Sequence, residues 1–124
     1  MIKLLFDTNF FIDYFQKQDY AMEALMDVRK REVEGYSSVM TLYELYLGIL
    51  GYPDEKQRMN EVQNLKNWFT FLPLGEQAML KAAQIDIHLN TLHRTVDMRD
   101  LLIAATAITQ NIPLKTRNKK DFQY

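Results

Sequence analysis

The 124-residue chain contains no cysteine, which excludes disulfide bonds and metal sites built on thiolates. Long apolar runs are also missing, since none approaches the roughly 18 consecutive residues that a membrane-spanning helix requires. The N-terminal segment, residues 1–7, lacks the basic region and long apolar core of a secretory signal peptide. We therefore expect no membrane association, and the expected location is the cytoplasm.

Net charge is almost absent as well. The formal value of −1 gives the whole chain no general affinity for nucleic acid. The charge is nevertheless uneven, because residues 94–124 hold six basic side chains against three acidic ones. This basic C-terminal segment could hold phosphate groups, or it could be an ordinary solvated tail.

Short apolar segments alternate with helical patterns along the chain. We predict strands over residues 2–6, 36–39, 69–74 and 114–116, and helices over 9–15, 21–31, 41–50, 55–68, 77–92 and 100–109. The helix over 41–50 is apolar nearly all round and should be buried. The alternation favours a parallel sheet with helices on both faces, in a single domain over residues 1–124.

Four acidic residues stand out against this pattern. Asp7 follows the first strand, Glu44 interrupts an otherwise uncharged helix, Asp100 begins another helix, and Asp121 follows the last strand. Each has an ordinary structural alternative: Asp7 could cap the next helix, Asp100 could be a first-turn acid, and Asp121 could lie on the surface. Glu44 is harder to explain, because no basic residue lies three or four positions away.

A shared site would explain all four acids, since ligands of open parallel sheets bind at the carboxyl ends of the strands. Two carboxylates about 4 Å apart repel by roughly 4 kcal/mol at an effective dielectric constant of about 20. A cluster of acids therefore needs a cation, and carboxylates without thiolates select Mg²⁺ or Mn²⁺. Such an ion can activate water for phosphodiester cleavage. His88 and His93 lie on a polar helix, so a histidine-based mechanism is disfavoured.

Four motifs occur in order along the chain: residues 6–9 (FDTN), residues 41–45 (TLYEL) with Gly48, residues 100–107 (DLLIAATA) and residues 116–122 (TRNKKDF). Together they resemble the PIN-domain ribonucleases, especially VapC-type toxins of toxin–antitoxin pairs. The resemblance implies a three-layer α/β/α fold with a central parallel sheet of four or five strands. The fifth would be the edge strand that relatives often add after the Asp-Phe pair, which here is followed by only two residues. It also implies a Mg²⁺-dependent endoribonuclease, usually a homodimer, that cleaves tRNA or ribosomal RNA and is held inactive by a cognate antitoxin.

The resemblance assigns roles to particular positions. Asp7, Glu44 and Asp100 match the three successive site acids, with Asp7 and Asp100 as the metal ligands. Asp97, one turn earlier, is interpreted as a helix cap or an outer group. The fourth site residue is Asn118 or Asp121, and the charge favours Asp121. The remaining matches are supporting residues (Thr8, Asn9 and Thr116) and candidate phosphate-binding residues (Arg117, Lys119 and Lys120).

Two further expectations concern partners and alternatives. Aromatic residues near Phe11 and Tyr46 could form an exposed surface that takes up an amphipathic antitoxin segment. A receiver domain would need an acidic pair after the first strand, and a haloacid-dehalogenase-like phosphatase would need an acid at Asn9, so both are disfavoured. A non-catalytic PIN-like module that binds RNA or protein remains the alternative.

Overall fold

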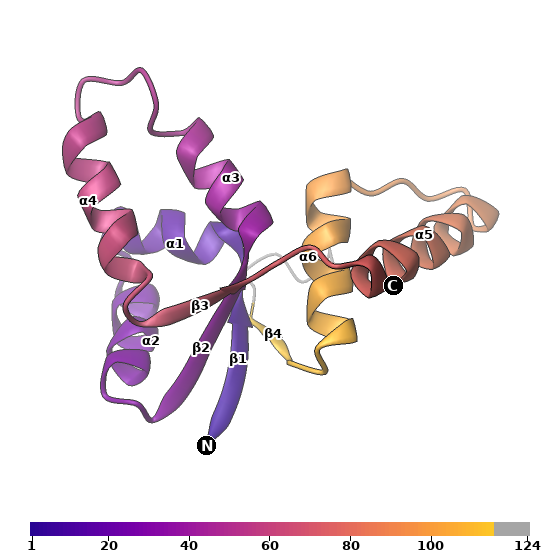
Figure 1. Cartoon of the computed structure of the whole chain (residues 1–124), viewed down its shortest axis with the longest axis horizontal. Coiled ribbons are helices and arrows are strands. Elements are labelled where there is room, and N and C mark those ends of the chain that lie inside the picture. Colours follow the sequence, from indigo (N-terminus) through magenta and orange to yellow (C-terminus); the bar gives the residue numbers. More distant parts are fainter. Residues whose placement is uncertain (116–124) are drawn as a thin grey trace.

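The computed structural model describes residues 1–115, which form a four-stranded parallel sheet flanked by helices (Figure 1). The strands are β1 (Ile2–Phe6), β2 (Val33–Ser38), β3 (Phe69–Leu72) and β4 (Leu114–Lys115). The helices are α1 (Thr8–Phe15), α2 (Asp19–Arg29), α3 (Val39–Leu47), α4 (Glu55–Leu65), α5 (Glu76–Thr91) and α6 (Met98–Thr109). The strand order β3-β2-β1-β4 places β1 and β2 side by side in the middle of the sheet.

The sheet lies between two helical layers, as the alternation of strands and helices predicts. Phe6 belongs to a core cluster that α1, α2 and α4 build on one face of the sheet. Leu5, the preceding residue, points to the opposite face and packs against Ile103 and Ala107 of α6. Side chains of a strand alternate between faces, so β1 contributes to both layers. Helix α5 packs against α6 on the side away from α1–α4 (Figure 1).

The second strand begins earlier than its sequence pattern predicts. We expected it at Tyr36, with Gly35 as its boundary, but β2 starts at Val33 and Gly35 pairs with Leu4 inside the sheet. Position 35 is a glycine for a steric reason, since a Cβ there would lie 2.7 Å from the Phe69 ring and 2.9 Å from Val28. Glycine here allows close packing of α2 and β3 rather than a turn.

The third helix is less buried than its composition suggests. Helix α3 buries Thr41 and Leu45, whereas Tyr43 and Leu47 are 53% and 52% exposed. The prediction that this helix is buried all round is therefore wrong. Its apolar residues on the outer side form part of the surface, and its inner side carries the polar residues of the site described below.

Four helices end in the same way, with a non-glycine residue in the left-handed conformation. These residues are Lys17, Arg31, His93 and Asn111, with φ between 54° and 60°. After α1, the amide of Lys17 donates to the Tyr14 carbonyl and the amide of Gln18 donates to the Asp13 carbonyl. This is the Schellman pattern, which normally uses glycine at the left-handed position. The chain therefore carries backbone strain at its helix ends.

Candidate functional site

The carboxyl ends of β1 and β2 bring Asp7, Ser37 and Ser38 to one edge of the sheet. Asp7 is 2% exposed and caps α1 by accepting a hydrogen bond of 3.2 Å from the amide of Phe10. The hydroxyl of Ser37 donates to the carbonyl of Phe6 at 2.7 Å and ties the end of β2 to the end of β1. Ser38 caps α3 by accepting from the amide of Met40. Both helices therefore begin at this edge.

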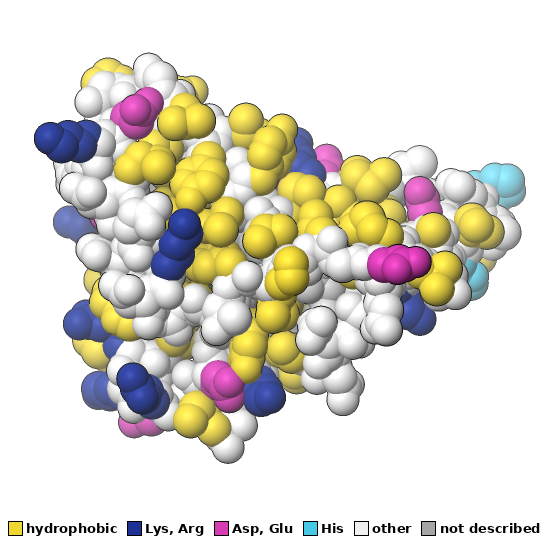
Figure 2. Space-filling view, in the orientation of Figure 1, with side chains coloured by type: hydrophobic (Ala, Val, Ile, Leu, Met, Phe, Trp, Pro, Cys, Tyr) yellow, Lys and Arg dark blue, Asp and Glu magenta, His cyan; other side chains and the backbone are white. Residues whose placement is uncertain are grey.

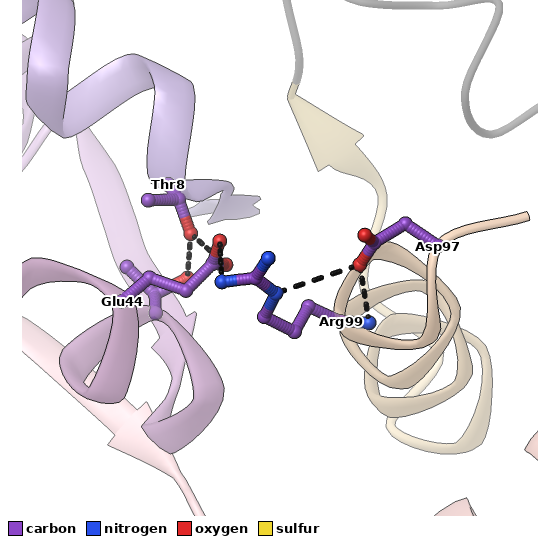
Figure 3. A network of polar contacts seen from close by, with 5 residues as sticks. Thr8, Glu44, Asp97 and Arg99 are labelled. Atoms are coloured by element: carbon purple, nitrogen blue, oxygen red, sulfur yellow. Dashed lines mark hydrogen bonds and ion pairs between the residues drawn. The ribbon is translucent and has the colours of Figure 1, made fainter. Parts of the chain in front are cut away.

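Glu44 lies on the inner side of α3 and is held by hydroxyl groups. Thr8 donates to Glu44 Oε1 at 2.7 Å, and the hydroxyls of Thr8 and Thr41 lie 3.1 Å apart (Figure 3). Thr41 has no exposed surface, so the contact between the Thr8 and Thr41 hydroxyls is sheltered from water, whereas the Glu44 side chain is 20% exposed. This short chain of hydrogen bonds links the residue that follows Asp7 directly to the second predicted acid, and thereby fixes one oxygen of Glu44.

The other oxygen of Glu44 faces a cation from the opposite layer. Nη1 of Arg99 lies 3.8 Å from Glu44 Oε2, and Nε of the same arginine lies 3.6 Å from Asp97 Oδ1 (Figure 3). Asp97 also caps α6 by accepting a hydrogen bond of 2.8 Å from the amide of Arg99. The interpretation of Asp97 as a cap is therefore confirmed. Arg99 connects α6 to α3 across the polar edge.

Asp100 follows Arg99 in the first turn of α6 and is half-buried. The first turn of a helix favours an anion because the unpaired amides carry partial positive charge. Asp7 is the N-cap of α1, the position that Asp97 holds in α6. Two of the predicted metal ligands thus lie where two helices begin, and Glu44 contacts a sequence neighbour of each, Thr8 after Asp7 and Arg99 before Asp100.

Asn9 is a half-buried residue of the first turn of α1. The other supporting and phosphate-binding residues that the sequence predicts lie outside the described residues, namely Thr116, Arg117, Asn118, Lys119, Lys120 and Asp121. The choice between Asn118 and Asp121 therefore stays a prediction. His88 and His93 are both exposed.

The acidic residues at this edge offer no sulfur but do offer carboxylate oxygens, which are the ligand atoms that a hard divalent cation prefers. Within residues 1–115, however, no three acidic or histidine side chains lie close enough together to hold a metal ion. Glu44 is paired with Arg99 instead. The edge thus fits a metal site in its chemistry, with an arginine beside one of the prospective ligands.

Three residues of this edge were missed by sequence reasoning: Ser37, Thr41 and Arg99. Thr41 had a usable signal, because a threonine three residues before Glu44 lies on the same side of the helix. Ser37 also had one, as a hydroxyl at the end of a strand. Arg99 had none, because its partner Glu44 is 55 positions away in the sequence and meets it only through the packing of α3 near α6.

A groove opens beside Glu44 between α1, α3 and α4, with a volume of about 240 Å³. Its apolar walls include Ile12, Phe15 and Ile49, and Arg58 lies at its polar margin. Figure 2 shows hydrophobic side chains gathered over the middle of one face of the molecule. Hydrogen bonds to Glu61 and to Asp54 raise the pKa of Arg58, so it keeps its charge.

The groove differs from the aromatic surface that the sequence predicts. Phe11 is fully buried and stacks edge-on against Phe10 and Phe69, so it cannot contact a partner. Tyr46 is partly buried against the same core cluster. The expectation of an exposed patch at Phe11 is therefore wrong. On α1, Phe11 faces the core, whereas the adjacent residue Ile12 and, one turn later, Phe15 line the groove.

The structure is that of an α/β protein with an acidic edge. Asp7 follows β1 and caps α1, Glu44 lies on α3, and Asp97 and Asp100 lie at the start of α6. The sequence matches the PIN domain over residues 4–123. It is 42% identical to "Ribonuclease VapC" of Rickettsia bellii over 73% of this chain and 69% of that protein. It is 32% identical to "Ribonuclease VapC1" of Methanocaldococcus jannaschii over 98% of this chain and 79% of that protein. The chain therefore belongs to the PIN-domain family, within its VapC ribonucleases.

Solved structures agree with this assignment. The fold resembles VapBC-1 from nontypeable Haemophilus influenzae with a TM-score of 0.81 and 26% identity, over 98% of this chain and 91% of that chain. It also resembles VapBC2 from Rickettsia felis, bound to a DNA fragment from their promoter, with a TM-score of 0.87 and 19% identity, over 98% of this chain and 92% of that chain. The predicted α/β fold is thus confirmed. None of the helices within residues 1–115 is long and apolar enough to cross a lipid bilayer.

Proposed function

We propose that this protein is a Mg²⁺-dependent endoribonuclease and the toxin of a toxin–antitoxin pair. The observation that carries the proposal is made in a chain of the VapC family: Glu44 is held by Thr8, which follows Asp7, and is paired with Arg99, which precedes Asp100. As in other VapC-type toxins, tRNA or ribosomal RNA would be the substrate, and the protein would act in the cytoplasm as a homodimer of single-domain chains. Mn²⁺ would substitute for Mg²⁺, because both ions prefer oxygen ligands.

Each residue of the edge has a defined task in this reaction. Asp7 and Asp100 would hold the metal ion, which when bound supplies an activated water and neutralises charge on the phosphate. Glu44 would complete the acidic set, with Thr8 keeping its Oε1 in place at 2.7 Å. Burial of Asp7 at 2% exposure excludes bulk water from its carboxylate. Low exposure strengthens the attraction between a carboxylate and a cation.

Residues outside the described part of the chain complete the proposal. Arg117, Lys119 and Lys120 would position the RNA by contacting phosphates, a sequence-independent contact that weakens as salt increases. Asp121, or Asn118 in its place, would be the fourth site residue, and Thr116 would help to order the edge. The basic character of residues 94–124 supports this arrangement.

The substitution Asp7→Asn tests the catalytic proposal. Asparagine caps a helix about as well as aspartate, so α1 should stay intact while the ligand charge is lost. We expect RNA cleavage in the presence of Mg²⁺ to fall by at least about 100-fold, and growth inhibition in cells to disappear. Asp27→Asn, an exposed position on α2, removes the same charge away from the edge and serves as the control.

The outcomes separate the two candidate functions. If Asp7→Asn cleaves RNA as fast as the parent protein, the metal-dependent mechanism is wrong. If the folded parent protein binds RNA or a protein partner but cleaves no RNA with Mg²⁺ or Mn²⁺, the alternative of a non-catalytic binding module replaces the ribonuclease.

The groove between α1, α3 and α4 is the proposed docking site for the cognate antitoxin. Its apolar walls suit the apolar side of an amphipathic helix, and Glu44 at its margin places the docked segment next to the acidic edge. Such a segment would block access of RNA to the site. The proposal draws support from the solved relatives, which are VapBC toxin–antitoxin complexes.

The product of the neighbouring gene, co-expressed with the tagged chain, provides the test. Ile12 lines the groove and is 38% exposed, so Ile12→Asp should weaken the complex by at least about tenfold by placing a charge in an apolar contact. Met22→Asp, at a 43% exposed position of α2, is the matched control. Absence of any complex, or equal binding of both variants, would count against this docking site.

A further inference from the structure

Both carboxylate oxygens of Glu44 already have partners within the chain. Oε1 accepts the hydroxyl of Thr8 at 2.7 Å, and Oε2 faces Nη1 of Arg99 at 3.8 Å (Figure 3). The hydroxyl is neutral and can stay in place when a cation binds Glu44. The guanidinium is itself a cation, so it cannot share the Oε2 side with a divalent ion without repulsion. Arg99 therefore lies where it opposes a metal ion.

The position of Arg99 is unfavourable from the standpoint of its own helix. It lies in the first turn of α6, where the helix dipole repels a positive side chain. Two carboxylates compensate for this: Asp97 next to it in sequence and Glu44 from α3. The bridge from α6 to α3 is thus what keeps the guanidinium over the acidic edge.

We propose that Arg99 is an internal counter-cation of Glu44 that competes with the divalent ion for this carboxylate, and so sets the metal affinity of the acidic edge. The inference rests on the proposed metal-dependent function and adds a positioning residue to it. Arg99 holds Glu44 while metal is absent, and it must give up Oε2 before Glu44 can serve a bound ion.

The size of the effect follows from exposure and distance. Arg99 is 45% exposed and Glu44 is 20% exposed, so solvent weakens their attraction. Exposed ion pairs of this kind change an equilibrium by about twofold to fivefold. In 1 M salt the screening length is about 3 Å, shorter than the 3.8 Å separation, so the competition should largely vanish there.

The experiment measures the dissociation constant for Mn²⁺ by isothermal titration calorimetry, without RNA, so its readout does not depend on catalysis. Arg99→Gln should bind Mn²⁺ about twofold to fivefold more tightly than the matched control Arg94→Gln. Arg94 is exposed and lies just before α6, so this control removes the same net charge. Arg99→Ala is the second variant in case the glutamine variant does not fold, and Arg99→Lys, which keeps the charge, should stay near the parent value.

A dependence on Glu44 distinguishes competition from a general charge effect. In a Glu44→Gln background, Arg99→Gln should leave the Mn²⁺ affinity unchanged, because the contested carboxylate is gone. Equal affinities of Arg99→Gln and Arg94→Gln, or weaker binding by Arg99→Gln, would overturn the inference while leaving the ribonuclease proposal intact. A parent protein and Arg99 variants that bind no Mn²⁺ would overturn both proposals.

Discussion

The hydroxyl of Thr8 should contribute strongly to stability because it joins two elements through a charged acceptor. It donates to Glu44 at 2.7 Å and contacts the hydroxyl of Thr41 at 3.1 Å. Thr8→Val keeps the shape of the side chain and removes only its hydrogen-bonding capacity. The substitution should therefore isolate the energy of this network from the packing around it.

The expected loss can be worked out from the two contacts. A hydrogen bond to a charged group contributes about 1.5–3 kcal/mol, and we take the lower end because Glu44 is 20% exposed and water can partly replace Thr8. Thr41 is fully buried, so its hydroxyl loses a partner that water cannot replace, at a cost of about 1 kcal/mol. The free energy of unfolding should fall by about 2–3 kcal/mol, which lowers Tm by roughly 10 °C in a domain of this size.

Urea denaturation of Thr8→Val measures this loss, with Thr70→Val as the control. Thr70 is exposed on β3, so its substitution should change the free energy of unfolding by less than about 0.5 kcal/mol. The double variant Thr8→Val/Thr41→Val should regain about 1 kcal/mol relative to the sum of the single losses, because no buried hydroxyl is left without a partner. A Thr8→Val protein as stable as the Thr70 control would refute the assigned role of this network.

Four further predictions concern packing, helix ends and metal. Gly35→Ala should lower the free energy of unfolding by about 1–3 kcal/mol, because its Cβ would lie 2.7 Å from the Phe69 ring. Gly48→Ala is the control and should be neutral or slightly stabilising, because its Cβ would lie 3.6 Å from the Leu45 carbonyl oxygen, an ordinary contact distance. Similar urea midpoints of the two variants would contradict this prediction. Lys17→Gly should stabilise the protein by about 0.5–1 kcal/mol by relieving the left-handed backbone at φ 60°, and an unchanged or lower Tm would be evidence against strain there. Ser38→Ala should cost about 1 kcal/mol in the same denaturation assay through loss of the cap of α3, and a smaller loss than about 0.3 kcal/mol would argue against the cap. Chelation by EDTA should abolish RNA cleavage and added Mg²⁺ or Mn²⁺ should restore it, so activity that persists in EDTA would exclude a metal-dependent reaction.

Local patterns predicted the secondary structure best where they matched burial. Residues 2–6 form a strand with the predicted bounds, because an apolar run ended by a polar turn has few alternative structures. The pattern was wrong at Gly35, which allows close packing instead of ending a strand. It was also wrong for α3, where apolar composition does not distinguish a buried side from an exposed one. Tyr43 and Leu47 are exposed because the neighbouring elements cover only one side of the helix.

The acids of the site could be recognised in the sequence because charge among apolar residues is conspicuous. Asp100 lies in the first turn of α6, as predicted, and Glu44 lies on the inner side of α3. Asp7 follows β1, as predicted, and it also caps α1, which was the structural alternative for this residue. The cation beside Glu44 could not be recognised. Local spacing identifies possible partners of Glu44 only on its own helix, whereas its actual partner comes from α6 in the other helical layer.

The sequence by itself determined the alternation of strands and helices, the absence of thiolate chemistry, and three acids next to apolar segments. These are local properties, since each depends on the order of residues within one or two turns of chain. The tertiary structure alone decided that Thr8, Thr41 and Arg99 surround Glu44, and that Phe11 faces the core while Ile12 lines the groove. The physical reason is that the packing angle of each helix, not its composition, selects which side chains meet across the edge of the sheet.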